Sequence, residues 1–566
     1  MVRLPALAVA AAVAVASLAG AETPEQFRVW GRRAAPNQYL ADPGPAPAGR
    51  PGLEATPAEL KDGVVVYRRP AFDPPPAGFV PSAADRCREL EVTDCPGQYG
   101  PLSFGVCAVR DTVLSLTVTG LRGPGGRTIG PEHFDIRAVR SIQVAVGDGL
   151  VVIPLLLESF DRANLPAGDS VSFWVTYHVP ADAAPGAYDG VVRCMAGGRE
   201  LSSVSLRLNV LPFRLVDPEL DLYMYSQDPG GPKAVAREYA DMRLHGMTTG
   251  WVHAPVTPEG VLAREAMGGA IESFRQAGFP RRVFFTDLAN RVTCRWLNDP
   301  DKSIGMWGPW FRYLPLSDAL DRRVVELLKL IRDESRARGL APIIEVGDEA
   351  GSHAWTIAPI KHYLELMKRE VPDLTRELTV GGGWASNEPE HDHWRGLLDI
   401  WTTNRWLADQ LAIVRSREPG VRFQLYNMAG AGSAPGGLSA ARHLFGFYAW
   451  AAGVAGAAQW VYFHTGTPEH NYAWPAEGGG FVPTLRWEAV REGAKDRRYL
   501  ATLEAALAGK TGPAADEARS FLGEVRDAIR LFHEDYDPVS GGRVHAPPPR
   551  TLDRWRDRMA ELMVKL

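Results

Sequence analysis

Residues 319–351 read ALDRRVVELLKLIRDESRARGLAPIIEVGDEAG, and this stretch decides the fold. In its first half, apolar residues recur every three or four positions, which predicts an amphipathic helix over 319–338. The apolar residues on that face are Leu320, Val324, Leu327, Leu328 and Ile331. The short apolar run Pro342–Gly347 follows and predicts a buried strand. A helix that leads into a buried strand is typical of the repeating unit of a parallel α/β sheet.

The same alternation of short apolar runs and helical patterns extends over residues 216–510. The predicted strands are Leu220–Tyr225, Thr248–His253, Arg282–Thr286, Pro342–Gly347, Glu377–Gly381, Leu398–Trp401, Arg422–Tyr426 and Ala458–Phe463. Eight strands in a region of this size predict one (β/α)8 barrel of the TIM type, which typically has about 250 residues. A doubly wound open sheet is the competing fold, and it is disfavoured because no Gly-rich nucleotide-binding turn follows any of these strands.

The segments on either side of the predicted barrel have other sequence patterns. Residues 87–215 contain short alternating strands and turn clusters, which predict a β-sandwich domain. The preceding residues 22–86 are rich in Pro, Gly and Ala and predict an extended lead-in with few strands. Residues 511–566 hold two helical patterns separated by a Pro/Gly-rich link and predict a short helical C-terminal segment that packs on the barrel. The expected architecture is therefore multidomain, a sandwich followed by a barrel.

The N-terminus predicts export. A positive charge at Arg3 precedes the apolar run 4–18 and the small residues Ala19-Gly20-Ala21, which together are typical of a secretory signal peptide over residues 1–21. The apolar run is shorter than the roughly 20 residues that a membrane span needs. We expect a periplasmic or extracellular protein with no membrane span after cleavage.

Composition excludes several function classes. The 62 basic and 67 acidic side chains give a net charge of -5, so we expect no nucleic-acid partner. The five cysteines lack the spacing of a zinc site, and His391-Asp392-His393 has no clear third ligand, so no metal is expected. The sequence has neither a Gly-x-Ser-x-Gly elbow nor a phosphate-binding loop, and no cofactor is expected.

The pair Asp348-Glu349 is the sharpest polar feature, because active sites of (β/α)8 barrels lie at the carboxyl ends of the strands. Taken alone, the pair is equally suited to cap the next helix. Its alternative role is acid/base chemistry on a glycosidic bond. Adjacent side chains on a strand point to opposite faces, so the pair is poorly placed as an acid and a nucleophile that flank one bond. A mechanism in which the 2-acetamido oxygen of the sugar attacks the anomeric carbon removes that requirement.

Further polar and aromatic residues lie at other predicted strand ends, where rings can pack against the apolar faces of sugars. Taken singly, each ring is better explained as a core residue of the barrel or of a helix interface, but we expect two or three of them to face the cleft. The aromatic candidates for substrate binding are Trp251, Trp384, Trp401, Tyr426, Trp460 and Tyr462. His253, Asn427 and His464 are candidates for hydrogen bonds from the same rim.

Several segments resemble glycoside hydrolase family 123 and related proteins with the same catalytic barrel and N-terminal β-sandwich. In the N-terminal part, the similar segments are Pro96–Phe104, Phe173-Trp174-Val175 and Pro185–Gly190. In the C-terminal part, the more specific segments are Gly446–Tyr462 and Arg486–Gly493, with Asp496 and Tyr499-Leu500. The resemblance covers residues 97–505.

The resemblance implies a retaining β-N-acetylgalactosaminidase with substrate-assisted catalysis. It implies that Glu349 protonates the leaving group and that Asp348 stabilises the oxazolinium-like intermediate. The chain departs from the family pattern at Ala350, where related sequences commonly have proline. We therefore expect a secreted hydrolase that removes terminal β-linked N-acetylhexosamine from a glycan, N-acetylgalactosamine being favoured. The alternatives are a conventional glycosidase for sugars without an acetamido group and a non-catalytic glycan-binding barrel.

Overall fold

The structure is a computed structural model of the 566-residue chain. It describes residues 52–76, 78–146, 149–226, 232–252, 264–280, 282–285, 316–348, 350, 357–380, 393–403, 408–429, 437–464, 470–475, 481–532 and 544–566. The predicted signal peptide lies outside these residues.

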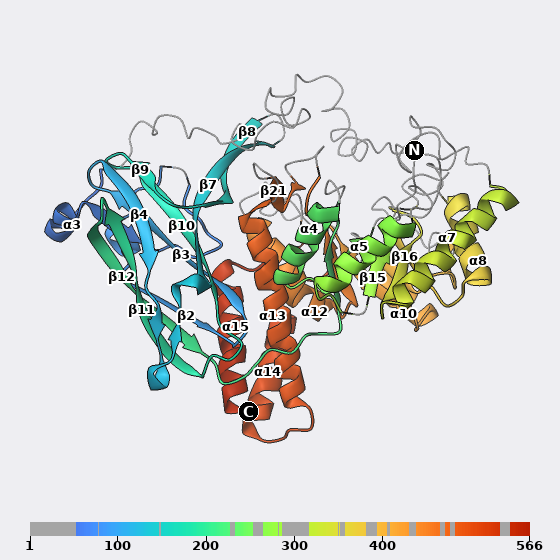
Figure 1. The fold of residues 1–566 in the computed structure, drawn as a ribbon. Coiled ribbons are helices and arrows are strands. Elements are labelled where there is room, and N and C mark those ends of the chain that lie inside the picture. Colours follow the sequence, from blue (N-terminus) through green and yellow to red (C-terminus); the bar gives the residue numbers. More distant parts are fainter. Residues whose placement is uncertain are drawn as a thin grey trace, which may run out of the picture.

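The N-terminal part of the chain is strand-rich and forms two sheets (Figure 1). One sheet has the order β1 (Val64–Tyr67), β3 (Tyr99–Ala108), β10 (Ser170–His178), β7 (Phe134–Val146) and β8 (Gly149–Ser159). The other has the order β2 (Glu89–Asp94), β12 (Arg199–Val210), β11 (Gly186–Ala196), β4 (Thr112–Val118) and β9 (Ala163–Leu165), and β5 (Leu121–Arg122) and β6 (Thr128–Ile129) extend it. Buried side chains of both sheets, among them Phe104 and Leu206, share one hydrophobic core.

Eight parallel strands form a nearly closed barrel, as the sequence predicts. In sheet order they are β13 (Asp221–Met224), β20 (Gly456–Gln459), β19 (Arg422–Tyr426), β18 (Ile400–Thr403), β17 (Thr375–Val380), β16 (Ala341–Glu345), β15 (Arg282–Phe285) and β14 (Trp251–Val252). The residues that lead into β14 complete the ring, since the amides of Thr248 and Thr249 donate to Leu222 O at 2.9 and 3.2 Å.

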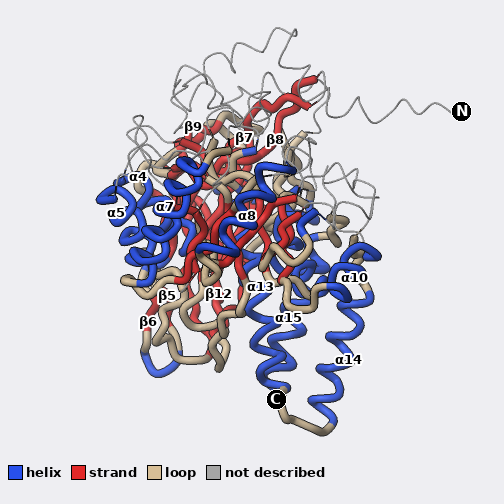
Figure 2. The backbone as a smooth tube through the Cα atoms, turned by 90° about the vertical axis from the view of Figure 1, so that its right-hand side faces the viewer, coloured by secondary structure: helices blue, strands red, loops and turns tan. Residues whose placement is uncertain are grey.

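Helices surround this barrel (Figure 2). They are α4 (Pro232–Leu244), α5 (Arg264–Gln276), α7 (Asp318–Arg336), α8 (Ile357–Glu370), α10 (Ala408–Arg417), α11 (Gly437–His443), the π-helical turn η9 (Leu444–Tyr448), α12 (Ala449–Ala452) and α13 (Leu485–Leu507). The predicted helix 319–338 is α7, which begins where the Ser317 hydroxyl accepts a hydrogen bond from the amide of Leu320. Its predicted apolar face is buried.

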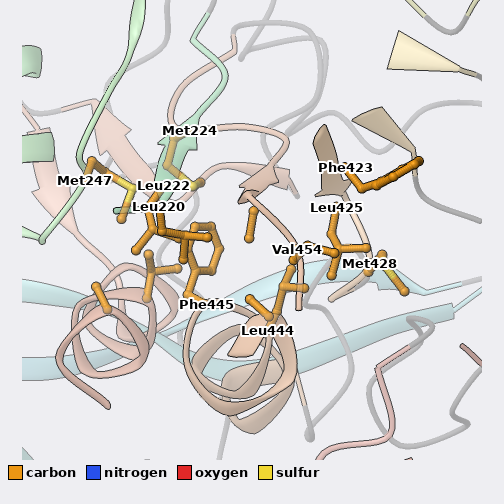
Figure 3. Packing of buried hydrophobic residues seen from close by; sticks show 14 of the residues in the cluster. Leu220, Leu222, Met224, Met247, Phe423, Leu425, Met428, Leu444, Phe445 and Val454 are labelled. Atoms are coloured by element: carbon orange, nitrogen blue, oxygen red, sulfur yellow. The ribbon is translucent and has the colours of Figure 1, made fainter. Parts of the chain in front are cut away.

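Outward-facing strand residues and inward-facing helix residues form the main core. Figure 3 shows Leu222 of β13 and Leu425 of β19 above Leu444 and Phe445 of η9. Successive residues of a strand point to opposite faces. The alternate residues therefore point into the barrel, where they form a second cluster with Tyr223, Phe284 and Ile343.

The C-terminal helices join the barrel to the strand-rich part. Helices α13, α14 (Pro513–Asp527) and α15 (Pro549–Lys565) pack together, and α15 lies beside the strand-rich part (Figure 1). Lys495 of α13 is buried and donates to Asp94 Oδ2 at 2.7 Å and to Tyr99 O at 2.9 Å. Arg556 of α15 donates to Asp496 Oδ1 at 2.6 Å.

Three further observations concern features that were considered in the sequence. Strand β1 lies within the predicted lead-in 22–86 and pairs with β3. No disulfide joins the described cysteines, which are buried, and none of the described helices is long and apolar enough to cross a membrane.

Candidate active site

The segment after β16 carries the candidate catalytic pair, and β17 holds it on both sides of Asp348. Before Asp348, Gly347 O accepts a hydrogen bond from Thr379 N at 3.2 Å. After it, Ala350 N donates to Thr379 O at 2.8 Å. Because both bonds go to the same residue of β17, Asp348 has no residue of its own opposite it, as at a β-bulge. Bulges re-aim side chains, and this one lies at the carboxyl end of the barrel strands.

The departure at Ala350 has a structural role in this bulge. Ala350 is fully buried, and its N–H makes the hydrogen bond that returns the segment to β17. Proline has no N–H and would leave Thr379 O without this donor. Alanine therefore suits the hydrogen-bonding pattern of this chain.

The inner wall of the barrel beside Asp348 is aromatic. Tyr225, which follows β13, lies at the centre of this wall: its ring centroid is 4.7 Å from that of Trp251 and 5.0 Å from that of Tyr426. Trp460, which follows β20, packs against the same cluster. The Trp251 Nε1 is buried and makes no hydrogen bond to a described residue, so an N–H donor is available inside the barrel.

Below this wall the barrel interior contains two buried glutamates that the sequence analysis did not single out. Glu345 of β16 and Glu377 of β17 are 2% and 0% exposed. The Thr379 hydroxyl lies 3.1 Å from Glu345 Oε1 and 3.3 Å from Glu377 Oε1. An acidic residue within a buried strand is the feature that marks both positions, because ionisable groups are rarely buried without a partner or a function.

Burial raises the pKa of Glu377 to about 8. Hydrogen bonds from the hydroxyl groups of Thr402 and Thr379 lower this pKa, and the Asp348 carboxylate raises it further. Glu377 is therefore largely neutral at pH 7, directly behind the candidate catalytic segment.

An ionic layer closes the opposite, amino end of the barrel. Asp221 of β13 accepts two hydrogen bonds of 2.9 Å from Arg282 and one of 3.0 Å from Gln424. The Asp221 carboxylate and the Arg282 guanidinium neutralise each other at the end of the barrel remote from Asp348. Residues at this end of the fold usually contribute to stability rather than to chemistry.

The predicted site residues separate into three groups. Asp348, Trp251, Tyr426, Asn427 and Trp460 lie at the carboxyl end of the barrel, on its inner wall or directly after its strands. The Asn427 amide donates to Ala458 O at 3.0 Å, and its side-chain carbonyl accepts a hydrogen bond from Gln459. These residues form the candidate active site.

Two predicted aromatic residues point away from that site. Trp401 belongs to the core between barrel and helices, because it alternates with the inward-facing Ile400 and Thr402. Tyr462 is fully buried outside the barrel, and its hydroxyl donates to Asp241 Oδ2 at 2.8 Å. The structure therefore gives both rings a packing role.

The remaining predicted residues, Glu349, His253 and Trp384, lie outside the described residues, as do His391 and Asp392. His464 is described, and its ring centroid is 5.5 Å from that of Trp460. No group of three His, Cys, Asp or Glu side chains that could hold a metal ion occurs in the described part of the chain.

A solved glycoside hydrolase shares this fold. No protein-family model and no curated protein matches the sequence. A family 123 glycoside hydrolase from Clostridium perfringens, whose structure was studied for glycolipid glycan hydrolysis, is 12% identical, with a TM-score of 0.62 over 89% of this chain and 98% of that chain. A family 39 glycoside hydrolase from Bacteroides cellulosilyticus WH2 is 12% identical with a TM-score of 0.39, over 72% of this chain and 81% of that one. The first similarity shows that the strand-rich part and the barrel occur together in a known fold.

Proposed function

We propose that this protein is a retaining glycoside hydrolase that removes terminal β-linked N-acetylhexosamine by substrate-assisted catalysis, N-acetylgalactosamine being the favoured sugar. The observation that carries the proposal is the position of Asp348: it lies in a bulge at the carboxyl end of β16, beside an aromatic inner wall. Carboxylates and aromatic rings at the carboxyl end of a barrel suit a sugar. The family 123 fold supports the same class of reaction.

In the proposed mechanism, the acetamido oxygen of the sugar bonds to the anomeric carbon while the bond to the leaving oxygen breaks. Glu349 gives its proton to that leaving oxygen and then accepts a proton from the water that opens the cyclic intermediate. Asp348 accepts a hydrogen bond from the acetamido N–H and stabilises the positive charge of the intermediate. Net retention follows from two successive displacements at one carbon.

The architecture and cellular location are part of the same proposal. We propose a β-sandwich domain over residues 87–215, a catalytic barrel over 216–510 and a helical segment over 511–566. The N-terminal run 1–21 supports export, with residues 22–86 as a lead-in. A glycan or glycoconjugate outside the cytoplasm is then the natural substrate class.

The first test is hydrolysis of an aryl β-N-acetylgalactosaminide by the wild-type protein and by Glu349→Gln. The variant cannot donate the proton, so we expect its kcat/KM to fall by about 100-fold or more. Asp333→Asn is the matched control, because Asp333 is an exposed carboxylate on α7. Equal rates in wild type and Glu349→Gln would rule out the assigned acid.

A thiazoline mimic of the cyclised intermediate separates this mechanism from its alternatives. Only a site that binds the cyclised acetamido group should be inhibited strongly, because such a mimic resembles the transition state. A conventional glycosidase would hydrolyse sugars without the acetamido group and resist the mimic. Glycan binding without turnover on a broad panel would favour a non-catalytic barrel.

A further inference from the structure

Two carboxyl groups face each other inside the barrel beneath Asp348. Glu345 and Glu377 are direct partners in the register of β16 and β17. Both side chains point into the barrel, and neither is more than 2% exposed. Like charges directly opposite on neighbouring strands are destabilising, and the dry interior strengthens their repulsion.

A single hydroxyl group lies between the two carboxyl groups. Thr379 Oγ1 is 3.1 Å from Glu345 Oε1, 3.3 Å from Glu377 Oε1 and 3.2 Å from the Tyr225 hydroxyl. A hydroxyl donates only one hydrogen bond, so Thr379 cannot donate to both carboxylates at once. Glu377 is also buried, and the hydroxyl of Thr402 is a second group that hydrogen-bonds to its carboxyl group. An additional proton on the pair would remove the repulsion between the two carboxylates.

None of the other described titratable groups that face Glu377 supplies a positive charge. They are Glu345 of β16, Asp348 after β16, Tyr223 of β13 and Tyr225 after β13. Burial raises the pKa of both tyrosines well above its usual value, and the charges of the two glutamates raise it further. The tyrosines are therefore neutral, so among the described groups that act on Glu377 the carboxyl groups are the ones that carry charge.

We propose that Glu377 is a positioning residue for Asp348 that works as a neutral carboxylic acid and shares one proton with Glu345. This inference rests on the proposed function and deepens it. While the two glutamates keep that proton, Asp348 remains ionised and accepts a hydrogen bond from the acetamido N–H. If Glu377 were ionised instead, its negative charge would favour the protonated form of Asp348. The shared proton would then be distributed among Glu345, Glu377 and Asp348, which titrate as coupled groups.

The first experiment needs no substrate and measures the midpoint of thermal unfolding from pH 5 to pH 9. The pKa of Glu377 is about 8 in the fold, against roughly 4.3 in an unfolded chain. The native state therefore binds more protons between these values, so its stability is full below the lower pKa and is lost as pH rises through the upper one. We expect Glu377→Gln, a neutral variant of similar shape, to reduce this loss.

Glu238→Gln is the matched control. Glu238 of α4 is buried, which raises its pKa to about 8, and Asp348 is not among the groups that shift it. This variant should also reduce the loss of stability with pH. In the pH profile of kcat/KM for the aryl glycoside, Glu238→Gln should leave the decline at alkaline pH where it is in the wild type. Glu377→Gln should remove one ionisation from that decline. An identical decline in wild type and Glu377→Gln would overturn the positioning role.

Infrared spectroscopy of the Glu238→Gln variant keeps the proposal testable if Glu377→Gln does not fold. The variant is needed because Glu238, whose pKa is also about 8, would give a carboxylic acid band of its own. We expect the C=O band of a protonated carboxylic acid at pH 7 and its loss by pH 9. Absence of that band at pH 7, or an unchanged pH dependence of stability in a folded Glu377→Gln, would overturn the shared proton. Absence of hydrolysis by the wild-type protein would contradict the proposed function instead, so the two failures are distinguishable.

Discussion

At the scale of single residues, the sequence identified the candidate segment but not its surroundings. Asp348 lies at the end of a strand, as predicted, because an apolar run followed by polar residues marks that position in any parallel α/β unit. The pairing of Glu345 with Glu377 depends on the register of two strands that are separated by a helix. Register of this kind is set by packing of the whole barrel, so one sequence does not reveal it.

Ala350 offers a test of the bulge. Ala350→Pro removes the N–H that bonds to Thr379 O and should destabilise the protein by about 1–3 kcal/mol, because a buried carbonyl loses its donor. Ala350→Gly keeps the N–H and should cost about 1 kcal/mol or less. Urea unfolding measures both variants. Equal stability of the proline variant and the wild type would show that the hydrogen bond contributes nothing.

At the scale of elements, the sequence predicted all eight barrel strands and α7, because each combines a clear hydrophobic period with flanking turns. Strand β1 was not predicted individually, because it has only four residues and lies within a Pro-rich stretch. The orientation of Trp401 and Tyr462 was also beyond sequence reasoning. An aromatic residue near a strand end has the same sequence signature on either face of the barrel wall.

The contact between α4 and α13 makes an element-scale prediction. Asp241 of α4 accepts hydrogen bonds of 2.8 Å from Tyr462 and from Trp487 of α13. Burial alone would raise the pKa of Asp241, but the His245 charge and these hydrogen bonds lower it to about 2. Asp241→Asn should cost roughly 2 kcal/mol near neutral pH, since charged hydrogen bonds of this kind are lost.

The pH dependence of that variant follows from the same groups. A lowered pKa gives stability that is present above about pH 4 and lost as pH falls towards 2. The stability difference between wild type and Asp241→Asn should therefore shrink over this acidic window. The side chain is 34% exposed, so solvent reduces the effect below that of a fully buried ion pair. A constant difference from pH 6 to pH 2 would contradict the assigned charge.

At the scale of the whole molecule, an ionic cluster fastens the strand-rich part to the C-terminal helices. Lys495 is 5% exposed and contacts both Asp94 of the strand-rich part and Glu492 of its own helix, at 2.7 and 2.9 Å. Charges this deeply buried depend on their partners. The sequence does not predict the cluster, because its members lie some 400 positions apart.

Lys495→Met should destabilise the protein by about 3–5 kcal/mol, because it leaves Asp94 and Glu492 buried without this partner. Lys565→Met is the matched control: Lys565 pairs with Glu517 on the surface, and its loss should cost about 1 kcal/mol or less. Chemical denaturation followed by tryptophan fluorescence compares the two. Similar midpoints for both variants would show that the cluster does not hold the two parts together.

The closure of the barrel between β13 and β20 also constrains how the chain is made in a cell. Asp221 pairs with Gly456, a sequence separation of 456 − 221 = 235 residues. At a synthesis rate of about 5–20 residues per second, the edge of β13 waits for roughly 12 to 47 s before its partner strand leaves the ribosome. During that interval an apolar strand edge is open to pairing with other nascent chains, and chaperone capture of this segment would protect it.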